Sequence, residues 1–319
     1  MAEPLDWDAE RILMEPPQRR HVFHGKREGD GWQAETFSWL ALLLLRHGGN
    51  TFERRPGERP RPSLGCPVMS AHFSFEVVNA LDYDELRSDY APDAVAWVAE
   101  RGRLTPGSLV VDLAAGTGQL SRRFMTLGID LVAVEPATNM RAVLEERLPA
   151  VRVLDGTAES IPLDAGSVDA VVVGNAFHHF DRQRAFAEIA RVLRPGRVLA
   201  LFWAWPLEEE SLRYPGLREV DEVVESTRES CQIATVYRTW MEPPQAAKGF
   251  GPFERREFPM THVIPSERLA DLYATSSDVA SLPAAAQADL LHRIRRLSRG
   301  LPEILRLPAR SVVDLCFRS

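Results

Sequence analysis

The sequence predicts an α/β fold in which a parallel sheet is covered by helices on both faces. From residue 92 onward, short valine-rich segments alternate with amphipathic segments of helical period. The short segments are mainly apolar on successive residues, without an alternation of polar and apolar positions, which is typical of strands that are buried on both faces. A turn with two glycines joins the first of these strands to the helix after it, as expected for a βαβ unit.

The predicted elements follow from residue 92 in order. A helix over 92–103 carries Pro92 in its first turn, where a missing N–H costs nothing. The apolar strands are expected at 109–111, 131–134, 151–154, 168–173 and 198–203. Amphipathic helices are expected between them at about 118–127, 138–148 and 181–194, the last ended by a Pro-Gly pair.

The alternation ends after residue 205. Residues 207–230 are charged and predict a helix, 241–259 is loop-rich, and 256–264 has the pattern of a strand. A helix over 283–299 and a final strand over 311–318 follow. We expect 206–280 to contain a lid or substrate insertion, within one domain that spans 69–319.

Residues 1–68 differ in composition from the rest of the chain. They are rich in proline and in charges of both signs, and they contain one short apolar stretch. We therefore expect a poorly structured extension. One hypothesis is that translation starts at Met69, and the alternative is a genuine regulatory or lid extension.

Composition and charge exclude several classes of protein. The chain has 319 residues, of which 45% are hydrophobic, and this is enough for a sizeable core. A formal charge of −7 argues against a nucleic-acid partner. Three widely spaced cysteines fit a reducing compartment and predict no metal site. The longest apolar run, 37–45, is too short to span a bilayer, so we expect a cytoplasmic protein without a membrane partner.

The glycine turn and an acidic residue predict a nucleoside site. Gly116 and Gly118 let the backbone approach a ligand closely, and the helix that begins there offers free N–H groups. Glu135 ends the next strand, where a carboxylate can accept hydrogen bonds from both hydroxyls of a ribose.

The nucleoside could belong to a dinucleotide, which would make the chain an NAD(P)-dependent oxidoreductase. A dinucleotide-binding fingerprint requires glycine or alanine at its third position, so that the helix can pack closely on the strand. Ser121 occupies that position and is bulkier. The turn therefore disfavours NAD, which stays an alternative.

Five motifs in order resemble those of the class I S-adenosylmethionine-dependent methyltransferases. They are VVDLAAGTGQL, VAVEP, GTAESIPL, VDAVVVGNAFHHF and EIARVLRPGRVLALFW. The resemblance covers roughly residues 75–205 and is similar in particular to the small-molecule branch that includes trans-aconitate methyltransferase-like proteins. It implies a Rossmann-like seven-stranded sheet with a small helical lid, and S-adenosyl-L-methionine as the cofactor.

The resemblance also implies roles for individual residues. Around the methionine end of the cofactor it places Asp112, Gly116 and Gly118, with Ala114 in place of the family's first glycine. Glu135 would hold the ribose, and Pro136 would border the adenine. The remaining cofactor residues would be Thr157, where many relatives have aspartate, with Ala158, Glu159 and Asn175.

The acceptor side of the site is expected at the end of the fourth strand and before the first helix. His178 or His179 could remove a proton from the acceptor, since histidine titrates near neutrality; the alternative is that one of them caps the next helix. The family's segment before the first helix folds over the cofactor, so Tyr83, Arg87 and Tyr90 could line the acceptor pocket, with ordinary helix packing as the alternative. Phe177 is expected to line the pocket as well.

Methyl transfer from a sulfonium needs alignment and exclusion of water, and neither a nucleophilic side chain nor a metal. The resemblance therefore implies a transferase that acts on an oxygen, nitrogen or carboxylate of a small molecule. A ligand-binding protein that resembles these enzymes without catalysis is the other alternative.

Overall fold

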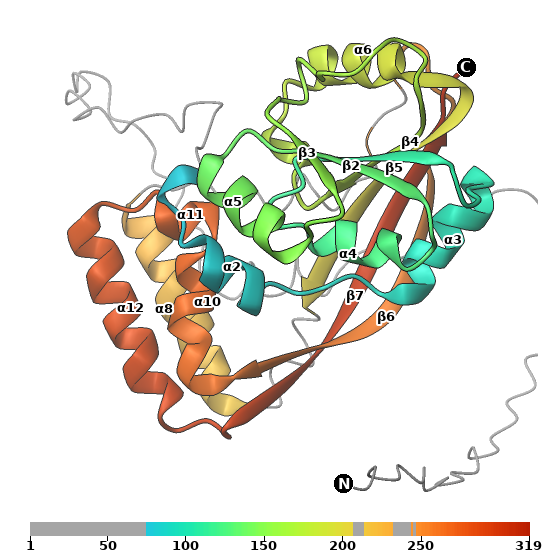
Figure 1. Ribbon diagram of the computed structural model, residues 1–319. Helices are drawn as coiled ribbons and strands as arrows, with labels where there is room; N and C mark the ends of the chain where they lie inside the picture. Colours follow the sequence, from blue (N-terminus) through green and yellow to red (C-terminus); the bar gives the residue numbers. More distant parts are fainter. Residues whose placement is uncertain (1–74, 207–213, 232–243, 245–246) are drawn as a thin grey trace, which may run out of the picture. The chain divides into compact units, whose positions relative to one another are not determined.

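The computed structural model describes residues 75–206, 214–231, 244 and 247–319, all of which belong to one unit, 63–319 (Figure 1). The predicted extension 1–68 and the hypotheses on its origin lie outside these residues, as do 207–213 and most of 232–246 within the predicted lid. Within the described residues, no helix is long and apolar enough to cross a membrane.

The described residues form a seven-stranded sheet with the strand order β3-β2-β1-β4-β5-β7-β6. Its strands are β1 (Leu109–Leu113), β2 (Asp130–Val134), β3 (Arg152–Leu154), β4 (Val168–Gly174), β5 (Leu193–Pro206), β6 (Glu254–Pro265) and β7 (Ile304–Phe317). The first five are parallel to one another, and β7 runs antiparallel between β5 and β6. After β3 the chain returns to place β4 beside β1, so the strand order reverses there, where open α/β sheets bind ligands.

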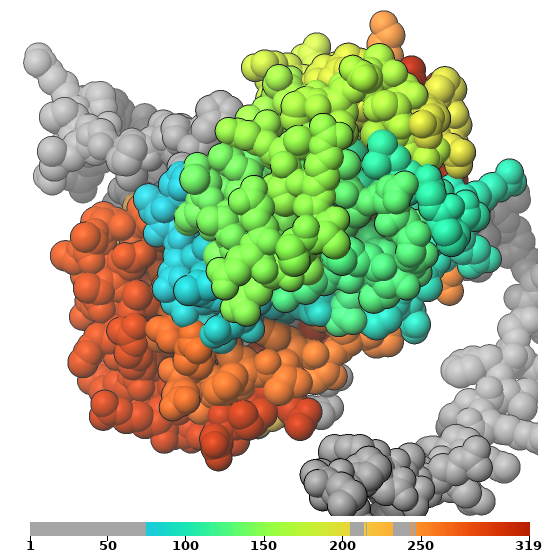
Figure 2. All heavy atoms as spheres, in the orientation of Figure 1, coloured from blue at the N-terminus to red at the C-terminus, as the bar shows by residue number. Residues whose placement is uncertain are grey.

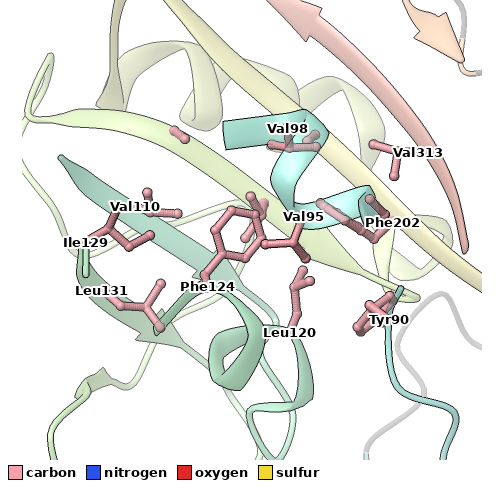
Figure 3. Packing of buried hydrophobic residues seen from close by; sticks show 14 of the residues in the cluster. Tyr90, Val95, Val98, Val110, Leu120, Phe124, Ile129, Leu131, Phe202 and Val313 are labelled. Carbon is pink, nitrogen blue, oxygen red and sulfur yellow. The ribbon is translucent and has the colours of Figure 1, made fainter. Parts of the chain in front are cut away.

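Each face of the sheet has its own apolar core, which confirms the prediction of strands buried on both sides. Val110 and Val172 face one core, and their neighbours Val111 and Val171 face the other. The first core is covered by α3 (Pro92–Gly102), α4 (Gln119–Met125) and α5 (Thr138–Arg147), and the second by α6 (Arg182–Val192). Figure 3 shows Phe124 of α4 at the centre of the first core, where its ring meets that of Phe202 edge-on at 5.9 Å.

A helical lobe with a third core is built on the far ends of β6 and β7. Among the described residues, 304–308 of β7 pair with β6 alone, so these two strands extend past the sheet as a ribbon. Against the ribbon pack η3 (Ser266–Arg268), α8 (Pro215–Ser230), α10 (Leu269–Ala274), α11 (Ser277–Ala280) and α12 (Ala284–Ser298). Leu305 of the ribbon and Leu290 of α12 are fully buried in this core.

Several boundaries and short helices differ from the sequence prediction. The helix predicted over 181–194 ends at Val192, because Leu193 already pairs with Val168 as part of β5. The final strand begins at Ile304 instead of 311. Pro308, which would interrupt a central strand, is tolerated here because it lies in the two-stranded ribbon. The helix α2 (Ala80–Leu86) has no predicted counterpart; it follows η1 (Phe75–Val77) and is capped by Asn79, whose side chain accepts two backbone N–H groups.

Candidate functional site

The glycine turn after β1 has a left-handed backbone at three positions. Ala114, Gly116 and Gly118 have φ of 55°, 59° and 88°. A Cβ on Gly118 would lie 2.8 Å from Leu148 Cδ1, so this glycine serves packing between α4 and α5. A Cβ on Gly116 would meet only Tyr83, at 3.8 Å. The side of the turn at Gly116 is therefore the open one, as a ligand contact requires.

Glu135 turns inward and braces the glycine turn. One carboxylate oxygen accepts a hydrogen bond from the Gly116 N–H at 2.9 Å, and the other accepts one from the Ala137 N–H at 2.8 Å. The side chain is buried, and burial raises its pKa although both hydrogen bonds act to lower it. The carboxylate thus links the segment after β2 to the glycine turn, and its role toward a ribose stays a prediction.

Beneath the turn lies a buried polar cluster. Asp112 is 1% exposed, and one of its carboxylate oxygens accepts a 2.6 Å hydrogen bond from the Ser121 hydroxyl. Its other oxygen and the Thr117 hydroxyl are buried without a partner in the described part of the chain. Burial raises the pKa of Asp112 to about 7. Buried polar atoms without partners carry a free-energy cost that a ligand can relieve.

The residues predicted to flank an adenine lie at the ends of β2 and β3. Pro136 and Thr157 are exposed, and Ala158 is buried in the second core. Glu159 accepts a hydrogen bond from the Asp181 N–H at 2.9 Å, which ties the loop to the start of α6. Glu159 therefore has a structural contact that its predicted role did not include.

At the end of β4, Asn175 joins two strands. It has a left-handed φ of 49°, its N–H donates to the Phe202 carbonyl, and its side-chain oxygen accepts from the Ala204 N–H at 2.9 Å. Phe177 was expected to line an acceptor pocket, and the structure corrects this. Its side chain is 2% exposed and packs against Phe180 and Phe186 in the second core.

The two histidines of this segment lie in η2 (Phe177–His179), among aromatic rings. His178 stacks on Trp203 at 5.9 Å between ring centroids, and His179 meets the ring of Phe75 edge-on at 5.5 Å. Burial lowers the pKa of His178 to about 2 and that of His179 to about 4. Both are neutral near pH 7, and both are weaker bases than a free histidine. The cap of α6 is Asp181, so neither histidine serves as its cap.

Tyr83, Arg87 and Tyr90 lie together on the segment around α2. Tyr83 is half-buried beside Gly116, and burial raises its pKa. Tyr90 is 4% exposed, and its hydroxyl lies so close to Gly174 that an added Cβ there would be 2.4 Å away. The guanidinium carbon of Arg87 is 5.3 Å from the centre of the Tyr83 ring. The structure thus brings the three side chains toward the ends of β1 and β4.

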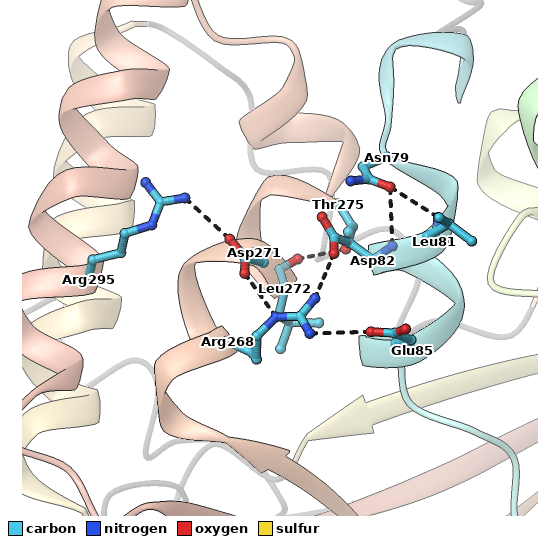
Figure 4. A network of polar contacts seen from close by, with 9 residues as sticks. All are labelled: Asn79, Leu81, Asp82, Glu85, Arg268, Asp271, Leu272, Thr275 and Arg295. Carbon is cyan, nitrogen blue, oxygen red and sulfur yellow. Dashed lines mark hydrogen bonds and ion pairs between the residues drawn. The ribbon is translucent and has the colours of Figure 1, made fainter.

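Ion pairs hold α2 against both the helix α4 and the helical lobe. Asp84 pairs with Arg122 of α4, and Arg268 of the lobe pairs with Asp82 at 2.6 Å and Glu85 at 3.2 Å (Figure 4). Figure 2 shows α2 at the surface, with α5 on one side and the helical lobe on the other. The helix is therefore positioned from two directions, which fixes Tyr83 beside the turn.

Sequence reasoning missed two partners of the site. It treated Ser121 only as an obstacle to close packing, although a serine one helical turn after the glycines can reach back to an aspartate in the strand. It could not find Arg268, because that residue is far from α2 in the chain and no local pattern joins them.

Comparisons with known proteins bear on this arrangement. The methyltransferase domain family matches residues 111–201 of this chain. An uncharacterized methyltransferase of Mycobacterium tuberculosis is 36% identical over 244 residues, which cover 74% of this chain and 91% of that protein. An uncharacterized methyltransferase-like protein of Schizosaccharomyces pombe is 26% identical over 239 residues, with coverage of 75% and 90%.

A solved structure shares the fold. It is that of a type II methyltransferase from Anaeromyxobacter dehalogenans, 24% identical, with a TM-score of 0.50 over 73% of this chain and 98% of that one. At this identity the likeness concerns the fold alone. The narrower resemblance to trans-aconitate methyltransferase-like proteins stays a prediction.

Proposed function

Since this chain belongs to the class I S-adenosylmethionine-dependent methyltransferases, we propose that it methylates a small-molecule acceptor at the site formed by the glycine turn, the end of β4 and the α2 segment. The observation that carries the proposal is the position of Glu135, whose buried carboxylate accepts a hydrogen bond from the N–H of Gly116 in the glycine turn. Membership of this family also decides against the alternative hypothesis of an NAD(P)-dependent oxidoreductase.

The residues present fit the cofactor. The space that a Cβ on Gly116 would occupy is open up to Tyr83 at 3.8 Å within the described residues, and Glu135 would hold the ribose beside it. The partnerless oxygens of Asp112 and Thr117 are the kind of groups that a bound ligand satisfies. When bound, S-adenosylmethionine supplies a methyl group on a positively charged sulfur. Pro136, Thr157, Ala158, Glu159 and Asn175 keep their predicted places around it in this proposal.

The protein's own part in the reaction is to align the partners and exclude water. Tyr83 covers the turn, and Tyr90 fills the space beside Gly174. We assign His178 and His179 the role of neutral hydrogen-bond acceptors that orient the acceptor's proton, because their pKa values of about 2 and about 4 suit a strong base poorly. A small molecule is favoured as the acceptor because the net charge of −7 offers little attraction to nucleic acid.

The proposal is tested by isotope transfer. The full-length protein is incubated with a metabolite extract and methyl-labelled S-adenosylmethionine, and products heavier by one methyl group are sought by mass spectrometry. We expect label in a small metabolite. Label found only in nucleic acid or protein, or in no product while S-adenosylhomocysteine still binds, would contradict the proposed acceptor class.

A further inference from the structure

A buried ion pair interrupts the second core, on the face of the sheet that α6 covers. Asp314 of β7 is fully buried, and its neighbours on the same face of the strand, Val312 and Cys316, belong to that core. Arg255, which lies opposite Asp314 on β6, donates to one carboxylate oxygen at 2.7 Å and to the other at 2.8 Å. Withdrawal of two charges from water is unfavourable, and an apolar pair of similar volume often gives equal stability. Stability alone therefore does not explain this pair.

The same carboxylate holds an indole on the next strand. In the sheet, β7 lies between β5 and β6 (Figure 1). The Nε1–H of Trp203 on β5 donates to Oδ2 of Asp314 at 3.2 Å. Asp314 pairs directly with Leu201, so Trp203 reaches it along the diagonal of the antiparallel pair. Trp203 is 4% exposed, and rotation of its ring would take a buried N–H away from this acceptor. The ion pair thus holds the Trp203 ring in one orientation.

Trp203 in turn supports the first of the two histidines after β4. The rings of His178 and Trp203 are stacked, with 28° between their planes and 5.9 Å between their centroids. The ring of His179 lies 3.8 Å from that of His178. Since η2 has only three residues, neighbouring rings rather than a long helix hold the plane of the His178 ring. A series of contacts therefore runs from the interior ion pair through a buried indole to a partly exposed imidazole.

We propose that Asp314 and Trp203 are positioning residues, which orient the ring of His178 toward the acceptor. The inference rests on the proposed function, in which His178 accepts a hydrogen bond from the acceptor. A hydrogen bond weakens steeply as its angle departs from linearity, so a ring that is held in one plane before the acceptor arrives makes the better bond. Loss of this series of contacts should lower the rate of methyl transfer. Cofactor binding should stay unchanged, because the series contains none of the residues predicted to bind the cofactor.

Replacement of the whole ion pair separates positioning from stability. Removal of one partner would leave an uncompensated buried charge, whereas Arg255→Leu/Asp314→Leu removes both charges and should stay folded. The rate of label transfer into a metabolite extract, at saturating methyl-labelled S-adenosylmethionine, should fall about tenfold to a hundredfold in this double variant. Its Tm, its KM for S-adenosylmethionine and its affinity for S-adenosylhomocysteine should match those of the wild type.

A second variant and a matched control complete the rate measurement. Trp203→Phe keeps the ion pair and an aromatic ring but loses the N–H that Asp314 accepts, and it should lower the rate as well. The control, Arg228→Leu/Asp278→Leu, removes an ion pair between α8 and α11 of the helical lobe and should keep the wild-type rate. A wild-type rate in Trp203→Phe or in the Arg255 double variant, or an equal loss in the control, would overturn the inference. No label with the wild type would overturn the proposed function and the role of the positioning residues with it.

Nuclear magnetic resonance follows His178 without any acceptor. In protein labelled at histidine, its ring signals are assigned by their absence from His178→Gln. Stacking on an aromatic ring displaces such signals, so they report the geometry between His178 and Trp203. Arg255→Leu/Asp314→Leu leaves both rings in the sequence and should still move the His178 signals, whereas the lobe control should not. Signals of His178 that do not move in the Arg255 double variant would overturn the positioning role even where label transfer is found.

Discussion

Substitution of Glu135 tests the link between the glycine turn and cofactor binding. In the wild type the carboxylate accepts hydrogen bonds from the Gly116 N–H at 2.9 Å and the Ala137 N–H at 2.8 Å. Glu135→Ala removes both acceptors and leaves the Ala137 N–H in a buried environment. Glu135→Gln keeps one oxygen and therefore one acceptor.

The magnitude follows from these two bonds. A hydrogen bond to a charged group contributes about 1.5–3 kcal/mol, so the loss of both in Glu135→Ala amounts to about 3 kcal/mol at the lower limit. A change of 1 kcal/mol shifts Tm by about 2–4 °C in a domain of this size, which gives a fall of roughly 6–12 °C. Glu135→Gln should lose about half of that.

The assay is thermal unfolding with and without S-adenosylhomocysteine. At a ligand concentration of about 100 Kd, the wild type gains about 2.7 kcal/mol, which raises Tm by roughly 5–11 °C. Both Glu135 variants should lose most of this gain, whereas the exposed Glu145→Gln on α5 should keep it. A full ligand-induced rise in Glu135→Ala would refute the assigned ribose contact, even if the predicted loss of stability is observed.

Three further predictions concern stability. The pKa of Asp112 rises from 3.8 to about 7 on folding, so the folded state holds a proton between these pH values that the unfolded state releases. The free energy of unfolding of the wild type should therefore fall by about 4 kcal/mol relative to that of Asp112→Asn as pH rises from about 4 to about 7. Denaturant unfolding at several pH values measures this difference, and a difference that does not change with pH would contradict the assigned burial. Gly174→Ala places a Cβ 2.4 Å from the Tyr90 hydroxyl and should lower the free energy of unfolding in urea by about 1–3 kcal/mol. In a double-mutant cycle, Tyr90→Phe removes the hydroxyl and should reduce the cost of Gly174→Ala. Effects of the two substitutions that simply add would argue against the contact. Arg268→Gln breaks partly exposed ion pairs to Asp82 and Glu85, so it should lower the free energy of unfolding by about 1 kcal/mol at low salt and by much less at high salt. Equal losses at both salt concentrations would exclude an ionic origin.

The parts of the fold that the sequence predicted are those with local causes. The strands β1, β2 and β4 each contain a run of three or four apolar residues, and the helix α6 has a clear apolar face, so these elements could be placed closely. The helix α2 was missed because only Ala80 and Leu86 of its seven residues are buried, and its packing partners lie far away in the chain. Its position depends on tertiary ion pairs that no local pattern reveals.

The same distinction applies to the site. Gly116 and Glu135 could be found because a turn and a strand end have signatures in the chain, and the structure places them in contact. The pKa values of His178 and His179 could not be predicted, since they depend on burial among rings from Phe75 and Trp203. The interior position of Phe177 likewise follows from packing against α6, and a sequence pattern alone left it as a pocket residue.

The division between matched and unmatched residues bears on acceptor choice. The family match covers 111–201, which contains β2 to β4, most of β1 and β5, and the residues predicted to bind the cofactor. A cleft of about 470 Å³, lined by Arg87 and Tyr90 of the predicted acceptor pocket, is formed mainly by 85–92 and 259–263, which lie outside that match. These two segments contain none of the residues predicted to bind the methyl donor. Exchange of both segments together between two such enzymes should transfer the acceptor preference. The affinity for S-adenosylhomocysteine should stay unchanged, because Gly116 and Glu135 stay in place. If the acceptor preference follows residues 111–201 instead, the cleft does not select the acceptor.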